Sequence, residues 1–139
     1  MSAENVELTR QGYVEFAEGR PLTNDDATPD FAWDMSNYSG WPERPVYEGV
    51  AGMQAFLADW TEAWDGWRMD LEALYDAGEK TVAVMRQHGR SKVTGMDLDM
   101  VFAQVWTFRD GLRSRMEMFS DVGEALRATG LDPDVEVAG

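Results

Sequence analysis

The sequence predicts one α+β domain in which helices come first and an antiparallel sheet follows. Two stretches of helical periodicity, at residues 4–18 and 50–65, enclose a short alternating strand at 31–35. Longer strands then follow one another with turns between them. Helices grouped ahead of such a run of strands are typical of α+β proteins. A strongly curved sheet of this kind would wrap around the helices and leave a pocket between them.

The two helices are predicted from their apolar faces. In 4–18, apolar side chains recur at helical spacing, and Gly19-Arg20-Pro21 ends the helix. The apolar face of 50–65 is wider and consists of Val50, Met53, Phe56, Leu57, Trp60 and Trp64. The stretch 36–49 contains Gly40, Pro42 and Pro45 and is predicted to be a loop. Its Trp41 is either a flap over the pocket mouth or an ordinary exposed aromatic residue.

The later strands are predicted at residues 67–75, 81–90, 96–109 and 112–119. Asp110-Gly111 is a strong hairpin signal between the last two. A short C-terminal helix is expected after Asp121, because Asp121 and Glu124 have the spacing of a capping box. We therefore expect residues 1–131 to form the domain and the acidic segment 132–139 to be a flexible tail.

The composition argues against several classes of function. The chain has 139 residues, no cysteine, one histidine and a net charge of −14. Such an acidic surface repels phosphate backbones and anionic lipids. We therefore expect neither a nucleic acid nor a membrane as a partner. One histidine without cysteine argues against a metal site, and without a phosphate loop or dinucleotide fingerprint we expect no cofactor. Since no signal peptide or membrane-spanning run stands out, we expect a cytoplasmic protein.

Two strands carry polar side chains that could perform chemistry. In 81–90, Arg86 and His88 share a face with Val82 and Val84. If that face looks into the pocket, His88 could form an acid–base pair with Glu117, and Arg86 could hold a carboxylate or enolate. The alternative is that Arg86 and His88 lie at a solvated strand end. In the last strand, alternation places on one face Arg113, Arg115, Glu117 and Phe119.

The long strand 96–109 presents one strongly polar residue on an apolar face. Alternation predicts that this face carries Met100, Phe102, Gln104, Trp106 and Phe108. A polar group such as Gln104 in an apolar wall often orients a ligand. Trp33, Trp106 and Phe119 would supply the apolar wall of a substrate site, or would belong to the core or a dimer interface.

Several segments spread over about residues 4–131 carry a resemblance to a known family. They are Tyr13-Val-Glu-Phe, Pro29-Asp-Phe-Ala-Trp, Tyr47-Glu-Gly-Val-Ala-Gly, Phe102-Ala-Gln-Val-Trp-Thr-Phe-Arg-Asp-Gly and Asp121-Val-Gly-Glu-Ala-Leu-Arg-Ala-Thr-Gly-Leu. Together they resemble the nuclear-transport-factor-2-like superfamily, which has a cystatin-like fold, and most closely its SnoaL-like branch, which includes polyketide cyclases. The resemblance implies a cone-shaped, curved antiparallel sheet wrapped around the N-terminal helices. It also implies a ligand cavity and, often, a homodimer formed through the sheet.

Two relatives by fold imply roles for particular residues. The resemblance to ketosteroid isomerase places Asp34 at its catalytic base, Tyr13 at its oxyanion-binding tyrosine and Gln104 at a protonated aspartate. The resemblance to limonene epoxide hydrolase places Arg86 at its arginine, and His88 and Glu117 at its two catalytic aspartates. Because His and Glu stand in for those aspartates, the titratable groups are kept but that enzyme's mechanism is not implied.

The sequence thus predicts a protein that binds a small hydrophobic carbonyl compound and could convert it by isomerase or cyclase chemistry without a cofactor. Asp34 or His88 is the expected base, with Tyr13 and Gln104 as hydrogen-bond donors. The alternative is a non-catalytic ligand-binding or interaction module with the same pocket. A homodimer is the expected assembly.

Overall fold

The structure is a computed structural model and describes residues 2–20, 22–38 and 45–131. Its elements are α1 (Ser2–Ala17), η1 (Asn24–Asp26), β1 (Ala27–Asn37), β2 (Val46–Glu48), α2 (Gly49–Glu62), β3 (Trp64–Ala77), β4 (Lys80–Ser91), β5 (Asp97–Arg109), β6 (Leu112–Phe119) and α3 (Val122–Ala128). The predicted α+β class is confirmed. Trp41 and the segment 132–139, for which we considered a flap and a flexible tail, lie outside the described residues.

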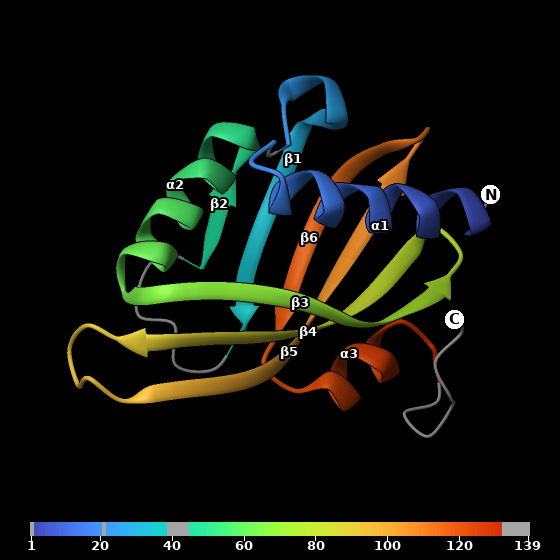
Figure 1. Ribbon diagram of the computed structural model, residues 1–139. Coiled ribbons are helices and arrows are strands. Elements are labelled where there is room, and N and C mark those ends of the chain that lie inside the picture. The colour runs from blue at the N-terminus through green and yellow to red at the C-terminus, as the bar shows by residue number, and fades with distance from the viewer. Residues whose placement is uncertain (1, 21, 39–44, 132–139) are drawn as a thin grey trace.

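The strands form one curved, unclosed sheet in the order β2-β1-β6-β5-β4-β3. Strands β3 to β6 make the predicted antiparallel meander, whereas β1 runs parallel to β6 and pairs Trp33 with Met116. In Figure 1, α1 and α2 lie over one side of the sheet and α3 lies against the other. We call the side under α1 and α2 the inner face, and the opposite side the outer face.

Both faces of the central strands are buried. The inner face packs against α1 and α2 through a core that includes Phe31, Trp33, Met53, Phe56, Met85, Phe102 and Trp106. The outer face packs against α3 through a smaller core made of Tyr75, Val82, Val84, Ala103, Val105, Phe119, Ala125 and Leu126. Because β4 contributes Met85 to one core and Val84 to the other, its apolar run has no solvent-facing side.

The boundaries differ most from the prediction between residues 27 and 64, where β1 (Ala27–Asn37) also extends the predicted strand 31–35 at both ends. The short strand β2 lies inside the predicted loop 36–49 and pairs Tyr47 with Trp33 of β1. This strand contains a buried tyrosine and lies beside a stretch rich in glycine and proline. Because it is so short, its sequence has no periodicity that could predict a strand. The helix predicted over 50–65 ends at Glu62 because β3 already begins at Trp64.

The hairpin between β5 and β6 forms at Asp110-Gly111, as predicted. Both residues have positive φ, 54° and 79°, which is the backbone of a two-residue type I′ turn. Beyond this turn the pairing slips, because Arg115 lies opposite Thr107 but Arg113 lies opposite Phe108. Ser114 is therefore the extra residue of a β-bulge, which re-aims the side chain that precedes it. Arg113 turns to the inner face, and the prediction that it shares a face with Arg115 is wrong.

No helix among the described residues is long and apolar enough to span a membrane.

Candidate functional site

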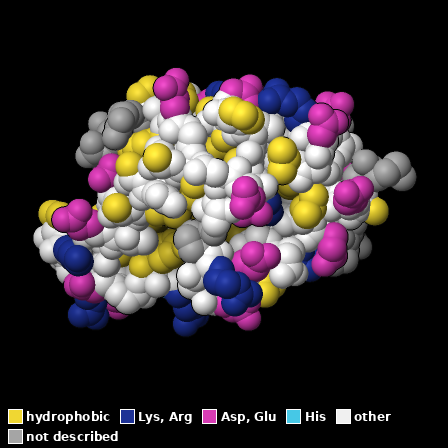
Figure 2. Space-filling view, turned by 90° about the horizontal axis from the view of Figure 1, so that it is seen from above, with side chains coloured by type: hydrophobic (Ala, Val, Ile, Leu, Met, Phe, Trp, Pro, Cys, Tyr) yellow, Lys and Arg dark blue, Asp and Glu magenta, His cyan; other side chains and the backbone are white. Residues whose placement is uncertain are grey.

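An apolar pocket lies between α1, α2 and the inner face of the sheet. Its lining includes Tyr13 and Phe16 of α1, Met53, Phe56 and Trp60 of α2, Trp33 of β1, Trp67 and Met69 of β3, Phe102, Gln104 and Trp106 of β5, and Arg113 and Met118 of β6. The volume in which the centre of a water molecule can lie is about 60 Å³, several times the roughly 10–15 Å³ that one water molecule needs. In Figure 2, hydrophobic side chains gather in the recess on this side, while many charged side chains lie toward its rim.

The polar centre of the pocket is a chain of three side chains from α1 and β5. Gln104 and Trp106 are two residues apart on β5 and therefore share a face. The indole Nε1–H of Trp106 donates to the Tyr13 hydroxyl at 2.8 Å, and that hydroxyl donates to Oε1 of Gln104. An indole can only donate, so the Tyr13 hydroxyl accepts from Trp106 and keeps its own proton, which it donates to the Gln104 amide oxygen.

This chain leaves the Gln104 amide nitrogen as a donor without a strong acceptor. The contact of Nε2 is with the sulfur of Met118 at 4.0 Å, and a thioether is a weak acceptor. Burial raises the pKa of Tyr13, although the Trp106 hydrogen bond and the charge of Arg113 act in the opposite direction. Tyr13 is therefore a neutral hydroxyl near neutral pH, and it keeps the Gln104 amide in one orientation.

Two tryptophans of the pocket wall are held by one amide oxygen. Oε1 of the buried Gln87 accepts from Nε1 of Trp60 at 3.0 Å and from Nε1 of Trp67 at 2.8 Å. Trp60 comes from α2 and Trp67 from β3, so Gln87 ties a helix and a strand to β4 from inside. Shared in this way, the acceptor fixes both indole rings and gives the wall a defined shape.

Arg113 is a pocket residue that the sequence did not reveal. It is 6% exposed, and its Nη2 donates to the carbonyl of Leu8 at 2.6 Å. Its guanidinium lies over the rings of Trp106 and Phe108, at 5.6 and 5.5 Å from their centroids. Burial lowers the pKa of Arg113, while the negative charges of Asp26 and Glu15 act in the opposite direction. A bulge predicted next to the Asp110-Gly111 turn would have placed Arg113 on the inner face. Bulges, however, are only weakly marked in a sequence.

Asp34, one of the two expected bases, lies on the outer face and does not line the pocket. Its buried carboxylate accepts hydrogen bonds from Ser36, both side chain and backbone, and from Arg115 of β6. Although burial opposes ionisation, these hydrogen bonds hold the pKa of Asp34 below its ordinary value. A carboxylate already paired in this way is a structural group, because its lone pairs are taken by protein donors.

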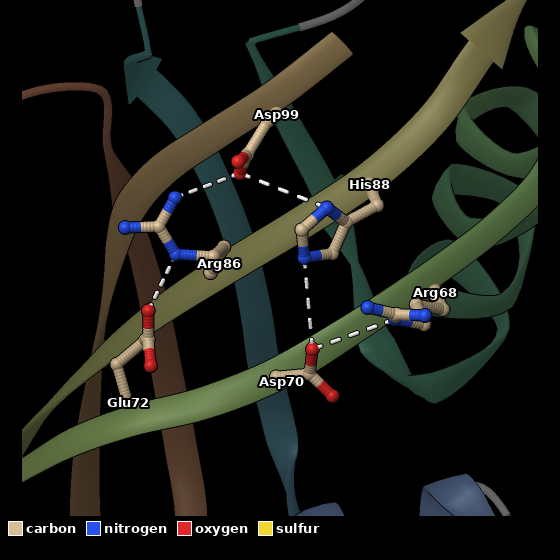
Figure 3. Close-up of polar contacts among 6 residues, drawn as sticks. All are labelled: Arg68, Asp70, Glu72, Arg86, His88 and Asp99. Atoms are coloured by element: carbon tan, nitrogen blue, oxygen red, sulfur yellow. Dashed lines mark hydrogen bonds and ion pairs between the residues drawn. The ribbon is translucent and has the colours of Figure 1, made fainter. Parts of the chain in front are cut away.

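His88 and Arg86 also lie on the outer face, within a group of charged residues (Figure 3). Nε2 of His88 is 3.7 Å from the carboxylate of Asp70, and Nδ1 is 3.7 Å from that of Asp99. The Arg86 guanidinium donates to Glu72 and, at 2.8 Å, to Asp99. All of these side chains are partly or largely exposed, so the solvated alternative describes them better than a pocket does.

The structure does not bring His88 and Glu117 together. Strand β5 separates β4 from β6, and Glu117 lies 3.8 Å from Lys80, near the opposite end of β4. Phe119 is also turned away from the pocket and packs in the outer core against α3. The condition on which the His88 site depended, that Val82 and Val84 face the cavity, is wrong because that side of β4 is covered by α3.

The pocket as described holds hydrogen-bond donors in an apolar wall. Its titratable lining residues are Tyr13 and Arg113, and both donate in the forms they hold near neutral pH. No carboxylate or imidazole appears among the described lining residues. In the described ranges, no three His, Asp or Glu side chains converge as metal ligands would. Such an arrangement can bind the oxygen acceptor of an otherwise apolar molecule.

Comparisons with known proteins agree with this fold. The model of the SnoaL-like domain family matches residues 13–116. A nuclear-transport-factor-2-like protein from Burkholderia thailandensis superposes with a TM-score of 0.74 at 25% identity, over 89% of this chain and 95% of that one. A candidate SnoaL-like polyketide cyclase from a Jannaschia species gives 0.69 at 21% identity, over 92% of each chain. A Catenulispora acidiphila protein with a ketosteroid isomerase-like fold gives 0.64 at 12%, over 94% and 97%.

No curated protein matches the chain at the level of sequence. The family match nevertheless covers most of the chain, from the pocket tyrosine in α1 to the middle of β6, and the solved structures share its sheet and helices. The chain therefore belongs to the SnoaL-like domain family, within the nuclear-transport-factor-2-like fold.

Proposed function

We propose that the protein binds a small, largely apolar carbonyl compound in the inner pocket, with the amide nitrogen of Gln104 as donor to its carbonyl oxygen. The observation that carries this proposal is the chain from Trp106 through Tyr13 to Gln104, which uses the amide oxygen and leaves the amide nitrogen available. A polar group fixed in an aromatic wall gives a ligand one preferred orientation.

Isomerase or cyclase chemistry is the finer expectation, and the geometry supports it less than binding. Removing a proton next to a carbonyl requires a base within hydrogen-bond reach. Asp34 and His88 lie on the outer face, and the family relationship to a candidate polyketide cyclase rests on 21% identity, which speaks to fold alone. Tyr13 is the titratable hydroxyl in the described lining that could act on such a substrate.

The proposal is tested with a matched pair of molecules, 1-indanone and its hydrocarbon counterpart indane. Binding is followed by fluorescence, since Trp33, Trp60, Trp67 and Trp106 all line the pocket. Wild type is expected to bind 1-indanone more tightly than indane. Gln104→Leu should reduce that preference by roughly fivefold to tenfold, the value of one hydrogen bond in an apolar site. Asp34→Asn, on the outer face, is the control and should leave the preference unchanged.

Two outcomes would change the conclusion. If wild type and Gln104→Leu prefer 1-indanone over indane equally, Gln104 does not donate to the carbonyl oxygen. Exchange of the 1-indanone protons beside the carbonyl in deuterium oxide, faster with wild type than with Tyr13→Phe, would favour an enzyme over a binding protein. The homodimer implied by the family resemblance stays a prediction, to be checked by the sedimentation of the purified chain.

A further inference from the structure

Arg113 places a positive charge inside the pocket, and its described partners do not neutralise it. Burying a charge is costly unless the group is paired and hydrogen-bonded. Arg113 contacts the Leu8 carbonyl and the faces of Trp106 and Phe108, which are neutral. Among the described residues, no carboxylate lies within ion-pair distance of it, and the charges of Asp26 and Glu15 act on it from further away.

The guanidinium stays charged and keeps donors to spare. Arginine remains protonated in proteins because its ordinary pKa is so high that a lowering by burial leaves it far above neutrality. Its five N–H groups form a planar fork suited to a carboxylate, and among the described residues only the Leu8 carbonyl accepts a hydrogen bond from them. Arg113 lines the same cavity as Gln104, so both donors face one space.

The first helix makes room for this side chain. At Gly12, a Cβ atom would lie 2.5 Å from Nη2 of Arg113, closer than two such atoms can approach. Glycine in the interior of a helix costs roughly 0.5–1 kcal/mol relative to alanine. At this position its use matches the space that the buried guanidinium occupies, so the helix is adapted to the arginine.

Building on the proposed function, we propose that the pocket takes an anionic ligand: a small apolar ring system that carries a carboxylate, which pairs with the guanidinium of Arg113. The apolar rings fill the space between the tryptophans, and the carboxylate supplies the missing negative charge. Gln104 then holds a second oxygen of the same molecule.

The net charge of the protein makes this preference diagnostic. With a net charge of −14, the surface as a whole repels anions. A preference for an anion over its neutral equivalent therefore has to come from a local positive group that is shielded from solvent. Exposed arginines such as Arg86 and Arg90 do not qualify, since each already has a carboxylate partner on the outer face.

The test compares indane-1-carboxylate with indane-1-carboxamide, which has nearly the same shape and no charge. Titration calorimetry with wild type at neutral pH is expected to show that the carboxylate binds about tenfold more tightly or better. This comparison needs no variant, so it stands even if substitutions at Arg113 reduce folding. Equal affinities for the two compounds in wild type, or a preference for the amide, would overturn the proposal.

Variants then assign the preference to Arg113. Arg113→Met should reduce the carboxylate-to-carboxamide ratio to about one, while Arg113→Lys should keep part of it, because the charge remains without the fork. Gly12→Ala keeps the charge but displaces the guanidinium, and should lower the ratio several-fold. A structural role alone would change the urea midpoint without changing this ratio. An unchanged ratio in folded Arg113→Met would overturn the assignment.

The result separates this inference from the proposed function. If 1-indanone binds through Gln104 but the carboxylate shows no preference, only the anionic ligand is wrong. If neither 1-indanone nor the carboxylate binds while the protein is folded by circular dichroism, both proposals fail.

Discussion

The inner and outer faces of strand β4 treat their polar side chains in opposite ways. On the outer face, Arg86 and His88 lie among carboxylates of β3 and β5 and are partly open to solvent. On the inner face, the buried Gln87 shares its oxygen between two indoles. A similar contrast separates Arg115 of β6, paired with Asp34, from Arg113, which has no such partner in the described chain.

The difference shows which polar residues point to a ligand. A dense group of charges whose members neutralise one another contributes little and is screened by salt. A few buried polar groups with unused hydrogen-bond donors favour a ligand more strongly, because a donor without a partner in an apolar site is costly. Figure 3 shows a group of the first kind, and the pocket around Gln104 and Arg113 is the second.

The largest difference between the two faces is expected when neighbouring residues of β5 that face opposite sides are each replaced by alanine. Phe102 is 1% exposed in the inner core, and Val101 is 40% exposed on the outer face. Phe102→Ala should lower the free energy of unfolding by about 4 kcal/mol, and Val101→Ala by less than about 0.5 kcal/mol, as measured in urea. A large loss for Val101→Ala would mean that the outer face is covered in solution, as a homodimer would cover it.

Removing the acceptor shared by two tryptophans is the next largest change. Gln87→Met removes the acceptor that the buried Trp60 and the half-buried Trp67 share, at a cost of about 2 kcal/mol. Part of the loss is offset, because the Gln87 amide nitrogen has no partner among the described residues and is removed too. Gln11→Met on the exposed side of α1 is the matched control and should change stability by less than about 0.5 kcal/mol. Equal effects would contradict a bridging role for Gln87.

Asp34 should contribute to stability in a pH-dependent way. Its pKa is lower in the folded than in the unfolded state, so its contribution is present above the ordinary value near 4 and is lost as the pH falls through the folded value. Asp34→Asn should therefore cost about 1.5 kcal/mol at neutral pH and progressively less in acid. Urea unfolding across the acid range checks this, with the exposed Asp59→Asn as control. A loss that does not depend on pH would contradict the pairing with Arg115.

The smallest effect is expected on the outer face. Arg86→Gln removes contacts with Glu72 and Asp99, but all three side chains are substantially exposed. We expect a change in the urea midpoint smaller than that of Gln87→Met, and one that shrinks further at about 1 M salt, where the screening length is near 3 Å. Lys92→Gln is the matched control, because this exposed lysine has no ion-pair partner within the described part of the chain. A salt-independent loss for Arg86→Gln alone would show that its ion pairs are shielded.

The sequence located one wall of the pocket because its pattern is one-sided. In the strand 96–109, alternation places Phe102, Gln104 and Trp106 on one face, and all three line the pocket. Tyr13 and Trp33 also line it, as expected. Gln104 stood out because it is the one strongly polar side chain on an apolar face, whereas Tyr13 was identified through the resemblance to ketosteroid isomerase.

The face of β4 could not be chosen from the sequence. Residues 81–85 are all buried, since α3 covers one side and the helices α1 and α2 cover the other. Alternation correctly grouped Arg86 and His88 with Val82 and Val84, but gave no means to tell the pocket side from the α3 side. For Arg113 the grouping itself was wrong, because the bulge at Ser114 shifts the alternation.

The parallel pairing of β1 with β6 determines when the sheet can be completed during synthesis of the chain. Asp34 and its hydrogen-bond partner Arg115 are 81 positions apart, so β1 waits for nearly the whole chain before its second edge is paired. An unpaired strand edge is prone to association with other chains. Arg113 and Met118 belong to that same late strand, so the ligand site is completed only when β6 has left the ribosome. Chains that terminate before residue 112 should therefore aggregate, and no ligand should rescue them.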